Sequence, residues 1–268
     1  MIHLTAVTRR PSYPSQRREF PFHVPAISTW ETLAFDAPVT FLVGENGSGK
    51  STFLEMLAAA ANLPTVGAQE VERDHTMAHA RELARHFRLT WAARTHRGFF
   101  LRAEDFFGFA KRMDQMQAEL EADLAAVEAE YADRSELAKG LARMPHAREL
   151  AALRERYGPG VDTRSHGESF LALFQARFVP GGLYLLDEPE APLSPLRQVG
   201  FLALLQEMME RDAQFIIATH SPILMALPGA RILDFDQAPP QPVPWDTLEH
   251  VTITRDFLNA PDAFLAQL

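Results

Sequence analysis

The sequence predicts an α/β protein with a mainly parallel core sheet, and two observations support this fold class. Apolar runs at Val39–Val43, Leu183–Leu186 and Gln214–Thr219 have the length and composition of buried strands. Stretches of helical periodicity separate these runs, and such alternation is typical of parallel sheets covered by helices. We therefore expect a single domain over residues 1–268, formed by this sheet and its helices.

The N-terminal region predicts a small antiparallel β part beside the core sheet. Ile2–Thr8 alternates apolar and polar residues, and Phe20–Ile27 is the candidate for the next strand. Between them, Arg9–Arg18 is a loop with proline, serine and arginines at both ends. These arginines form either a solvated turn or a contact for phosphate groups.

The stretch that links the first apolar run to a helix fits the phosphate-binding pattern GxxxxGK[ST]. Its residues are Gly44, Glu45, Asn46, Gly47, Ser48, Gly49, Lys50, Ser51 and Thr52. The glycines let successive N–H groups turn toward phosphate oxygens, and the positive end of the following helix faces the same anion. We expect Lys50 to reach the β- and γ-phosphates of ATP and Ser51 to place its hydroxyl on Mg²⁺.

Two adjacent carboxylates follow the apolar run Leu183–Leu186, and Pro189 ends the strand. An acid at the end of a strand beside a phosphate loop can hold Mg²⁺, so we expect Asp187 to share the metal with Ser51. Glu188 is placed to polarise the water that attacks the γ-phosphate.

A histidine follows the third apolar run, in the sequence His220-Ser221-Pro222. A histidine at a strand end is either a capped loop residue or a catalytic group. The phosphate loop and the Asp-Glu pair favour the catalytic interpretation, in which His220 hydrogen-bonds the γ-phosphate or orients the attacking water.

Between the phosphate loop and the two carboxylates, the sequence predicts a helical subdomain at about residues 105–180. From Lys111 to Tyr157 apolar residues recur at steps of three and four, with charges of both signs on the other face. We expect a helical hairpin, broken at Pro145, that packs on the core or binds a partner. Before it, Arg97–Phe107 is either a strand that turns into a helix burying its aromatic residues or a segment that senses the γ-phosphate.

Two further stretches complete the chain. Ser165 and Glu168 form a capping box before the helical stretch Phe170–Phe178, and with the Gly167 N–H the serine hydroxyl can also bind an anion. After a strand at 230–235, we expect a proline-rich surface crossing and then a mixed helical pattern at 245–268, to which we assign no chemistry.

Composition excludes several classes of protein. The formal net charge of −9 argues against a basic nucleic-acid-binding surface over the whole molecule, although a local basic patch remains open. The absence of cysteine excludes a disulfide framework and a thiolate metal site. The N-terminus lacks a signal-peptide pattern, and no run approaches the roughly 18 apolar residues of a membrane span. We therefore expect a cytoplasmic protein.

The order of these motifs resembles the ABC ATPase superfamily. More narrowly, the chain is similar to small stand-alone bacterial ATPases of the AAA/ABC type through the segments GFFLRAE, SHGESF, DEPEAPLSP and ATHSPI. The resemblance covers nearly the whole chain. It implies the α/β phosphate-loop NTPase fold of the ABC type, with hydrolysis of Mg-ATP to ADP and phosphate.

The resemblance also implies a role for each matching residue. Gly44, Gly49, Lys50, Ser51 and Thr52 match the Walker A loop, Asp187 the Walker B aspartate, Glu188 the catalytic glutamate, His220 the switch histidine, and Ser165 and Gly167 the signature. In the family the signature acts on ATP held by a second subunit, which implies an ATP-sandwiched homodimer. An aromatic residue upstream of the loop stacks on adenine in many members, and Tyr13, Phe22 and Trp30 are the candidates here.

Several positions depart from the family pattern. His166, Glu168 and Ser194 replace the usual glycine, glutamine and aspartate. The aromatic segment lacks the glutamine of the Q-loop, for which Arg102 or Glu104 can substitute. These departures weaken the resemblance to transporters more than the resemblance to ATPases.

The function predicted from sequence is a soluble ABC-type ATPase whose dimer couples hydrolysis to a partner protein or nucleic acid. The alternative is the ATP-binding subunit of a membrane ABC transporter, which a neighbouring permease gene would favour. A phosphate-loop kinase is a third possibility, which the Asp-Glu-Pro sequence and His220 disfavour. No further carboxylate cluster indicates a nuclease.

Overall fold

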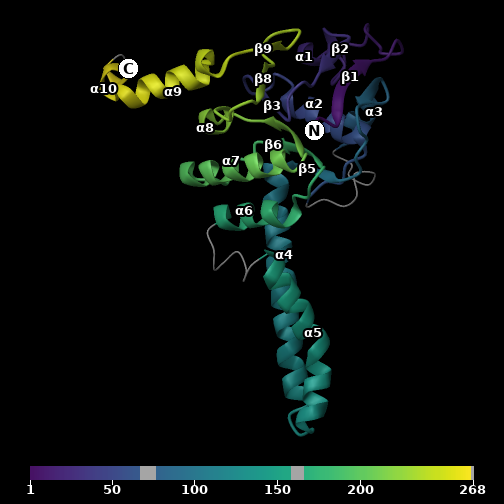
Figure 1. Cartoon of the computed structure of the whole chain (residues 1–268). Helices are drawn as coiled ribbons and strands as arrows, with labels where there is room; N and C mark the ends of the chain where they lie inside the picture. The colour runs from purple at the N-terminus through teal and green to yellow at the C-terminus, as the bar shows by residue number, and fades with distance from the viewer. Residues whose placement is uncertain (67–76, 158–165, 267–268) are drawn as a thin grey trace. The chain divides into compact units, whose positions relative to one another are not determined.

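The computed structural model describes residues 1–66, 77–157 and 166–266, and these form two compact units (Figure 1). The larger unit combines Met1–Ala103 with Val179–Leu268, and the smaller unit is Glu104–Phe178. In the described part of the chain, no helix is both long enough and apolar enough to cross a membrane.

Among the described residues, the larger unit contains a six-stranded sheet with the strand order β5-β6-β7-β3-β8-β9. Its strands are β3 (Val39–Val43), β5 (Gly98–Arg102), β6 (Leu183–Asp187), β7 (Gln214–Ala218), β8 (Arg231–Asp234) and β9 (Gln241–Pro242). All neighbours are parallel except β9, which runs antiparallel to β8. The predicted mainly parallel α/β fold is confirmed, while the proline-rich crossing contributes a short, exposed edge strand.

A second, antiparallel sheet has the order β2-β1-β4. It consists of β1 (Leu4–Arg9), β2 (Thr32–Ala34) and β4 (Phe87–Trp91), which confirms the predicted antiparallel part. The strand predicted at Phe20–Ile27 is wrong, because Pro25–Ser28 forms the short helix α1. Proline cannot donate to a strand ladder, and Pro25 instead occupies the first turn of the helix, where no donor is needed.

Three arginines of the N-terminal loop, Arg9, Arg10 and Arg17, bind other groups of the protein. Arg9 and Arg10 donate to the carbonyls of Ser28 and Phe87. Arg17 forms an ion pair with Glu19 and another with a second glutamate, Glu82. These contacts favour the structural interpretation of the loop, in which the arginines hold its ends in place.

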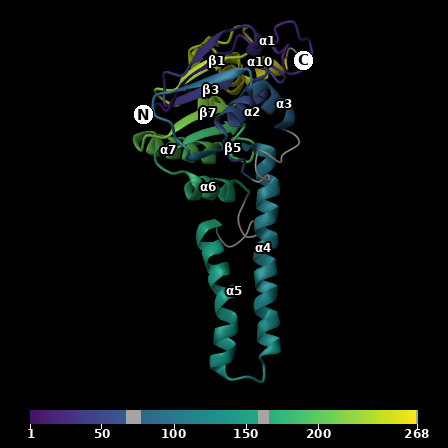
Figure 2. The same cartoon turned by 90° about the vertical axis from the view of Figure 1, so that its right-hand side faces the viewer.

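Helix α2 (Lys50–Ala61) contacts strands of both sheets as well as helix α3 (Ala78–Ala84). Its buried residues join one hydrophobic core with side chains from β1, β3, β6 and β7: Phe53, Leu54, Leu57, Leu4, Val7, Leu42, Leu185 and Ile216. Helix α7 (Pro195–Glu210) lies on the other side of the parallel sheet from α2 (Figure 2). The sheet is therefore covered on both faces, as its continuous apolar strands require.

The buried side chain of Gln214 ties the two sheets together. Its Oε1 accepts hydrogen bonds from the backbone N–H groups of His3 (2.9 Å) and Leu4 (2.8 Å), and its Nε2 donates to the Leu4 carbonyl (2.8 Å). All five polar atoms, two of the Gln214 amide and three of the backbone, would be costly to bury without partners. The amide thus acts like a short piece of strand between β7 and the start of β1.

The smaller unit contains α4, whose bounds are Ala103–Glu130, followed by α5 (Glu136–Tyr157) and α6 (His166–Arg177). Helices α4 and α5 form an antiparallel hairpin (Figure 2) that buries Leu120 and Leu150. Ion pairs link the two helices at Glu128–Arg143, Asp123–His146 and Glu121–Arg154.

The break predicted at Pro145 is wrong, because α5 continues through it. Proline has no N–H to donate to the carbonyl one turn earlier. Because Pro145 is exposed, that carbonyl lies on the solvent side of the helix. Short helices α8 (Pro222–Met225), α9 (Glu249–Asn259) and α10 (Pro261–Leu265) belong to the C-terminal part of the larger unit, with the 3₁₀ turn η2 at Trp245–Thr247.

Gly98→Ala is expected to destabilise the larger unit strongly. Gly98 has a φ of +125°, and a Cβ there would lie 1.8 Å from the carbonyl oxygen of Leu183 on the neighbouring strand β6. Because the Cβ position is fixed by the backbone and the carbonyl belongs to the backbone, neither can rotate away, and the strands must separate at a cost of about 3 kcal/mol or more. Urea unfolding followed by fluorescence measures the change.

Gly140→Ala in α5 is the matched control. A Cβ at Gly140 meets no atom within 4 Å, and alanine in a helix interior is favoured over glycine by about 0.5–1 kcal/mol. This variant is expected to be at least as stable as the parent. Equal stability of Gly98→Ala and the parent would contradict the close approach of β5 and β6.

Candidate functional site

The phosphate loop joins the end of β3 to the start of α2, and its backbone requires glycine. Gly44, Gly47 and Gly49 have φ angles of 135°, 87° and 104°, which residues with a side chain rarely adopt. At Gly49 a Cβ would also lie 2.6 Å from Cγ1 of Val24. This conformation at a helix N-terminus suits a loop whose N–H groups surround an anion.

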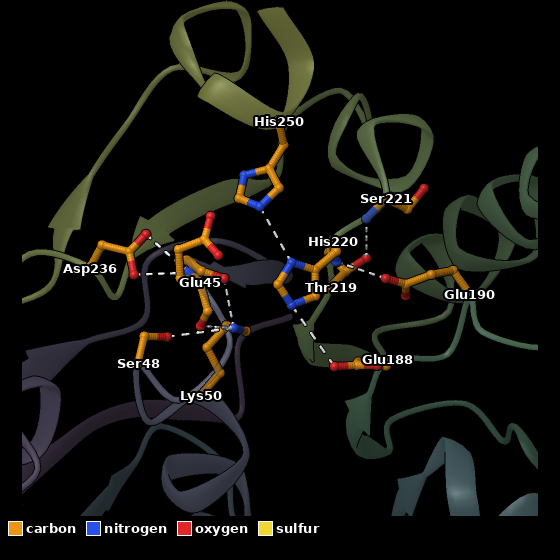
Figure 3. A network of polar contacts seen from close by, with 11 residues as sticks. Glu45, Ser48, Lys50, Glu188, Glu190, Thr219, His220, Ser221, Asp236 and His250 are labelled. Atoms are coloured by element: carbon orange, nitrogen blue, oxygen red, sulfur yellow. Dashed lines mark hydrogen bonds and ion pairs between the residues drawn. The ribbon is translucent and has the colours of Figure 1, made fainter. Parts of the chain in front are cut away.

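The ammonium group of Lys50 lies against this loop (Figure 3). Its Nζ donates to the carbonyls of Gly44 at 2.7 Å and Glu45 at 2.9 Å. Burial lowers the pKa of Lys50. The negative charges of nearby carboxylates oppose this shift, and Asp236 makes the largest opposing contribution. The lysine is therefore placed to exchange two carbonyl oxygens for phosphate oxygens of a nucleotide.

Asp187 ends β6 beside the first turn of α2. The Ser51 hydroxyl donates to its carboxylate, while Oδ1 is buried and makes no hydrogen bond among the described residues. A buried carboxylate oxygen without a partner, next to a hydroxyl, fits a hard cation such as Mg²⁺. The described residues hold no cluster of three or more histidine or acidic side chains that could bind a metal by themselves.

Burial raises the pKa of Asp187 to about 7, and the carboxylates of Glu188 and Glu55 add to the shift. An acid with a raised pKa in the folded state destabilises the fold once it ionises. Without Mg²⁺ or nucleotide, the free energy of unfolding should therefore fall as pH rises from about 4 through about 7. The same ionised carboxylate is the form that binds Mg²⁺.

Asp187→Asn is expected to remove the loss of stability that accompanies ionisation of Asp187. The variant should be more stable than the parent by about 2–4 kcal/mol at pH 8 and by much less at pH 5, since each pKa unit corresponds to about 1.4 kcal/mol. Urea unfolding of the nucleotide-free protein at both pH values measures the difference. A difference that is the same at both pH values would contradict the raised pKa.

Glu188 has an unusual backbone conformation. Its φ of 51° is left-handed, which costs energy for a residue with a side chain. Its N–H donates to the Ala218 carbonyl at 2.9 Å, which joins the ends of β6 and β7. The side chain is 46% exposed, and its Oε1 lies 3.9 Å from Nε2 of His220. Strain of this kind is common where a side chain is aimed into a functional site.

His220 lies just beyond the end of β7, facing Glu188 (Figure 3). Its backbone N–H donates to Oε1 of Glu190 at 2.7 Å, and its Nδ1 lies 3.3 Å from Nε2 of His250. Burial is the main cause that lowers the pKa of His220, and the positive charge of Lys50 lowers it further. The negative charge of Glu188 acts in the opposite direction. The ring is therefore held against protonation, with Nε2 buried and without a hydrogen bond among the described residues.

The structure brings most of the residues predicted from sequence together. The phosphate loop, the Asp187-Glu188 pair and His220 follow the carboxyl ends of β3, β6 and β7, which are neighbours in the sheet. In open parallel sheets ligands bind at this edge.

Three residues at this site carry no role in the sequence analysis. Glu190 accepts from the Thr219 hydroxyl and the His220 N–H, and burial raises its pKa. Both carboxylate oxygens of Asp236 accept from the Glu45 N–H, at 2.8 and 3.0 Å. His250, in the first turn of α9, contacts His220. The end of a fourth parallel strand could have indicated Asp236, whereas no sequence signal indicates His250.

The signature residues cannot be placed in the same way. Ser165 lies outside the described residues, and Gly167 lies in the first turn of α6, in the smaller unit. Of the two proposed Q-loop substitutes, Arg102 ends β5 in register with Asp187 and donates to Glu55 at 3.2 Å. Glu104 lies in the first turn of α4.

The three adenine-stacking candidates are wrong. Tyr13, Phe22 and Trp30 are 6%, 1% and 6% exposed, and all belong to the hydrophobic core. Tyr13 donates its hydroxyl to the Phe22 carbonyl, and the Trp30 indole donates to Ala26. Their ring faces pack against other side chains, so none is available to a base.

Comparisons with known proteins agree with a nucleotide-binding core. Residues 58–226 match the family model described as "AAA domain, putative AbiEii toxin, Type IV TA system", and residues 26–83, which include the phosphate loop, match a second model described as "AAA domain". No curated protein matches the sequence.

Similar solved structures have low identity. They include an inward-facing putative metal-chelate type ABC transporter (15% identity, 95% of this chain and 88% of that chain covered, TM-score 0.48). The Smc head domain of Pyrococcus furiosus with the C-terminal domain of ScpA has 13% identity, coverage of 91% and 96%, and a TM-score of 0.46. The SMC head domain of Thermotoga maritima has 14% identity, coverage of 91% and 99%, and a TM-score of 0.43.

Proposed function

The chain belongs to the AAA domain family whose model spans residues 58–226, and from this premise we propose that it binds and hydrolyses Mg-ATP as an ABC-type ATPase. One observation carries the proposal. Lys50, the Asp187-Glu188 pair and His220, which are far apart in the sequence, meet at one edge of the parallel sheet around a glycine loop.

Each group has a role in hydrolysis. The N–H groups of residues 44–52 and the Lys50 ammonium bind the β- and γ-phosphates. Ser51 and Asp187 would hold Mg²⁺, which when bound would neutralise phosphate charge. Glu188 accepts a proton from water as its oxygen attacks the γ-phosphorus, the bond to the bridging oxygen breaks, and ADP leaves. His220 donates from Nε2 to a γ-phosphate oxygen.

The working form that we propose is an ATP-dependent homodimer. Glu188 and His220 have side chains that are 46% and 29% exposed, and phosphoryl transfer requires exclusion of bulk water. A second copy that brings Ser165 and Gly167 onto the γ-phosphate would cover them. Closure and opening of this dimer would couple hydrolysis to a partner protein or nucleic acid.

The experiment that tests the proposal combines phosphate release with solution mass. We expect the purified chain to release phosphate from Mg-ATP and to shift from monomer to dimer, by light scattering, with a non-hydrolysable ATP analogue. Ser165→Arg should stay monomeric and still bind nucleotide, because the bulky cation would block the dimer interface and leave the phosphate loop of each monomer unchanged.

Ser135→Arg, in the turn of the helical hairpin, is the control and should dimerise like the parent. A normal dimer of Ser165→Arg would exclude Ser165 from the interface. A parent that binds no nucleotide and releases no phosphate would contradict the ATPase itself.

A further inference from the structure

His250 contacts the candidate switch histidine from a part of the chain that has no role in the proposed hydrolysis. It lies in the first turn of α9, and its Nε2 is 3.3 Å from Nδ1 of His220 (Figure 3). The two ring centroids are 5.4 Å apart. The distance and the facing nitrogens indicate a hydrogen bond, which requires one proton between the two rings.

Packing holds His250 in this position. Leu248 and Val251, on either side of it, are 6% and 3% exposed. The Trp245 indole donates to the Pro222 carbonyl at 3.0 Å, which links the start of this segment to the first residue of α8, two positions after His220. The orientation of His250 is therefore set by the fold, and it approaches His220 from a defined direction.

The direction of the hydrogen bond determines what His220 presents to the site. In a neutral imidazole one nitrogen carries the proton and the other accepts. If His220 donated from Nδ1, its Nε2 would direct a lone pair at Oε1 of Glu188, 3.9 Å away. Two acceptors would then face each other. If His250 donates, His220 carries its proton on Nε2, toward the carboxylate.

The second arrangement also leaves the buried Nε2 of His220 able to meet an incoming acceptor. That atom makes no hydrogen bond among the described residues, and phosphate oxygens are acceptors. A histidine locked with its proton on Nδ1 would present no donor to them. The same reasoning explains why a second residue is needed, because a free imidazole exchanges between both tautomers.

We propose that His250 is a positioning residue that donates its Nε2 proton to Nδ1 of His220 and keeps His220 in the Nε2–H tautomer. The tautomer follows from the geometry of the nucleotide-free chain. Its effect on hydrolysis rests on the proposed function, in which His220 donates to the γ-phosphate.

The first test is a direct observation of the tautomer. Protein labelled with ¹⁵N at histidine is examined by long-range ¹H–¹⁵N correlation without nucleotide at about pH 8, above the usual histidine pKa. His220 is assigned by its loss in His220→Asn. We expect the Nε2–H pattern for His220 in the parent and in His96→Gln, which removes an exposed histidine elsewhere.

Two substitutions at His250 test whether a hydrogen-bond donor at this position sets the tautomer of His220. His250→Gln retains an N–H donor of similar reach and should retain the Nε2–H pattern. His250→Glu replaces the donor with an acceptor and should move the His220 proton to Nδ1 or leave His220 doubly protonated. The charges of Lys50, Glu188 and Glu45, which also act on His220, are unchanged in both variants.

An Nδ1–H pattern in the parent would overturn the proposal, and so would an Nε2–H pattern in folded His250→Glu. Circular dichroism and thermal melting confirm that each variant folds. These readouts need no ATPase activity, so they do not depend on the proposed function.

The second test measures turnover. His250→Glu should lower kcat about 10²-fold, the scale of losing one donor to the transition state, with little change in nucleotide affinity, and His250→Gln should remain near the parent. If His250→Glu changed the tautomer of His220 but left kcat unchanged, the hydrogen bond between the two histidines would still be supported. The proposed role of His220 in hydrolysis would be contradicted.

Discussion

Glu188→Gln is expected to abolish ATP turnover while nucleotide binding is retained. Glutamine has nearly the same shape and can occupy the strained position at the end of β6, but its amide cannot accept the proton of the attacking water. Loss of a general base typically lowers the rate about 10²–10⁴-fold. Because Asp187 and Lys50 are unchanged, Mg-ATP should bind as it does in the parent.

The measurement pairs phosphate release with calorimetric titration of Mg-ATP. Glu210→Gln, an exposed acid at the end of α7, is the control for a change of one charge and should keep the parent rate. Trapped Glu188→Gln with Mg-ATP should also accumulate as the dimer. Parent-level hydrolysis by Glu188→Gln would show that the base has been assigned to the wrong residue.

Lys50→Ala should instead lose nucleotide binding. The substitution removes the cation that would bridge the β- and γ-phosphates, and hydrogen bonds to charged groups are worth about 1.5–3 kcal/mol each. Affinity for Mg-ATP should fall by about 10- to 100-fold or more. It also removes the contacts to Gly44 and Glu45, so the empty loop should become less ordered.

Calorimetric titration of Mg-ATP measures this loss, with Lys111→Ala as the control because Lys111 is an exposed lysine in α4. Unchanged affinity in Lys50→Ala would mean that phosphate does not bind at this loop. The two variants therefore divide the site into a binding part and a chemical part, and a structural collapse would affect both measurements together.

Local signals explain why much of the site could be predicted from the sequence. A glycine loop between a buried strand and a helix is a contiguous pattern, and the ends of β6 and β7 are marked by charged or polar residues after apolar runs. Because parallel strands align their carboxyl ends, residues with these separate signals lie at one edge of the sheet.

The predictions from sequence were wrong or incomplete where tertiary packing determines the position of a residue. An aromatic residue that packs in a core looks the same in sequence as one that stacks on a base, so Tyr13, Phe22 and Trp30 could not be separated from a nucleotide contact. Helix α5 continues through Pro145 because the proline ring is exposed and ion pairs to α4 hold the helix on both sides of it, at Arg143–Glu128 and His146–Asp123. The place of His250 depends on how η2 and α9 dock beyond the sheet, which no local pattern encodes.

The order of the strands has a consequence for synthesis on the ribosome. The strand that leads into the phosphate loop, β3, pairs only with β7 and β8 among the described strands. Gln214, which holds the start of β1, is 210 positions from Leu4. At about 5–20 residues per second, on the order of ten seconds or more pass before these partners emerge.

During that interval the apolar strand β3 has no neighbour to cover its backbone donors and acceptors. A nascent chain that stops before β7 therefore contains the whole phosphate-loop sequence without the sheet that gives the loop its shape. A bound nucleotide would therefore stabilise this fold only after most of the chain has been made, and until then the early apolar segments are exposed to aggregation.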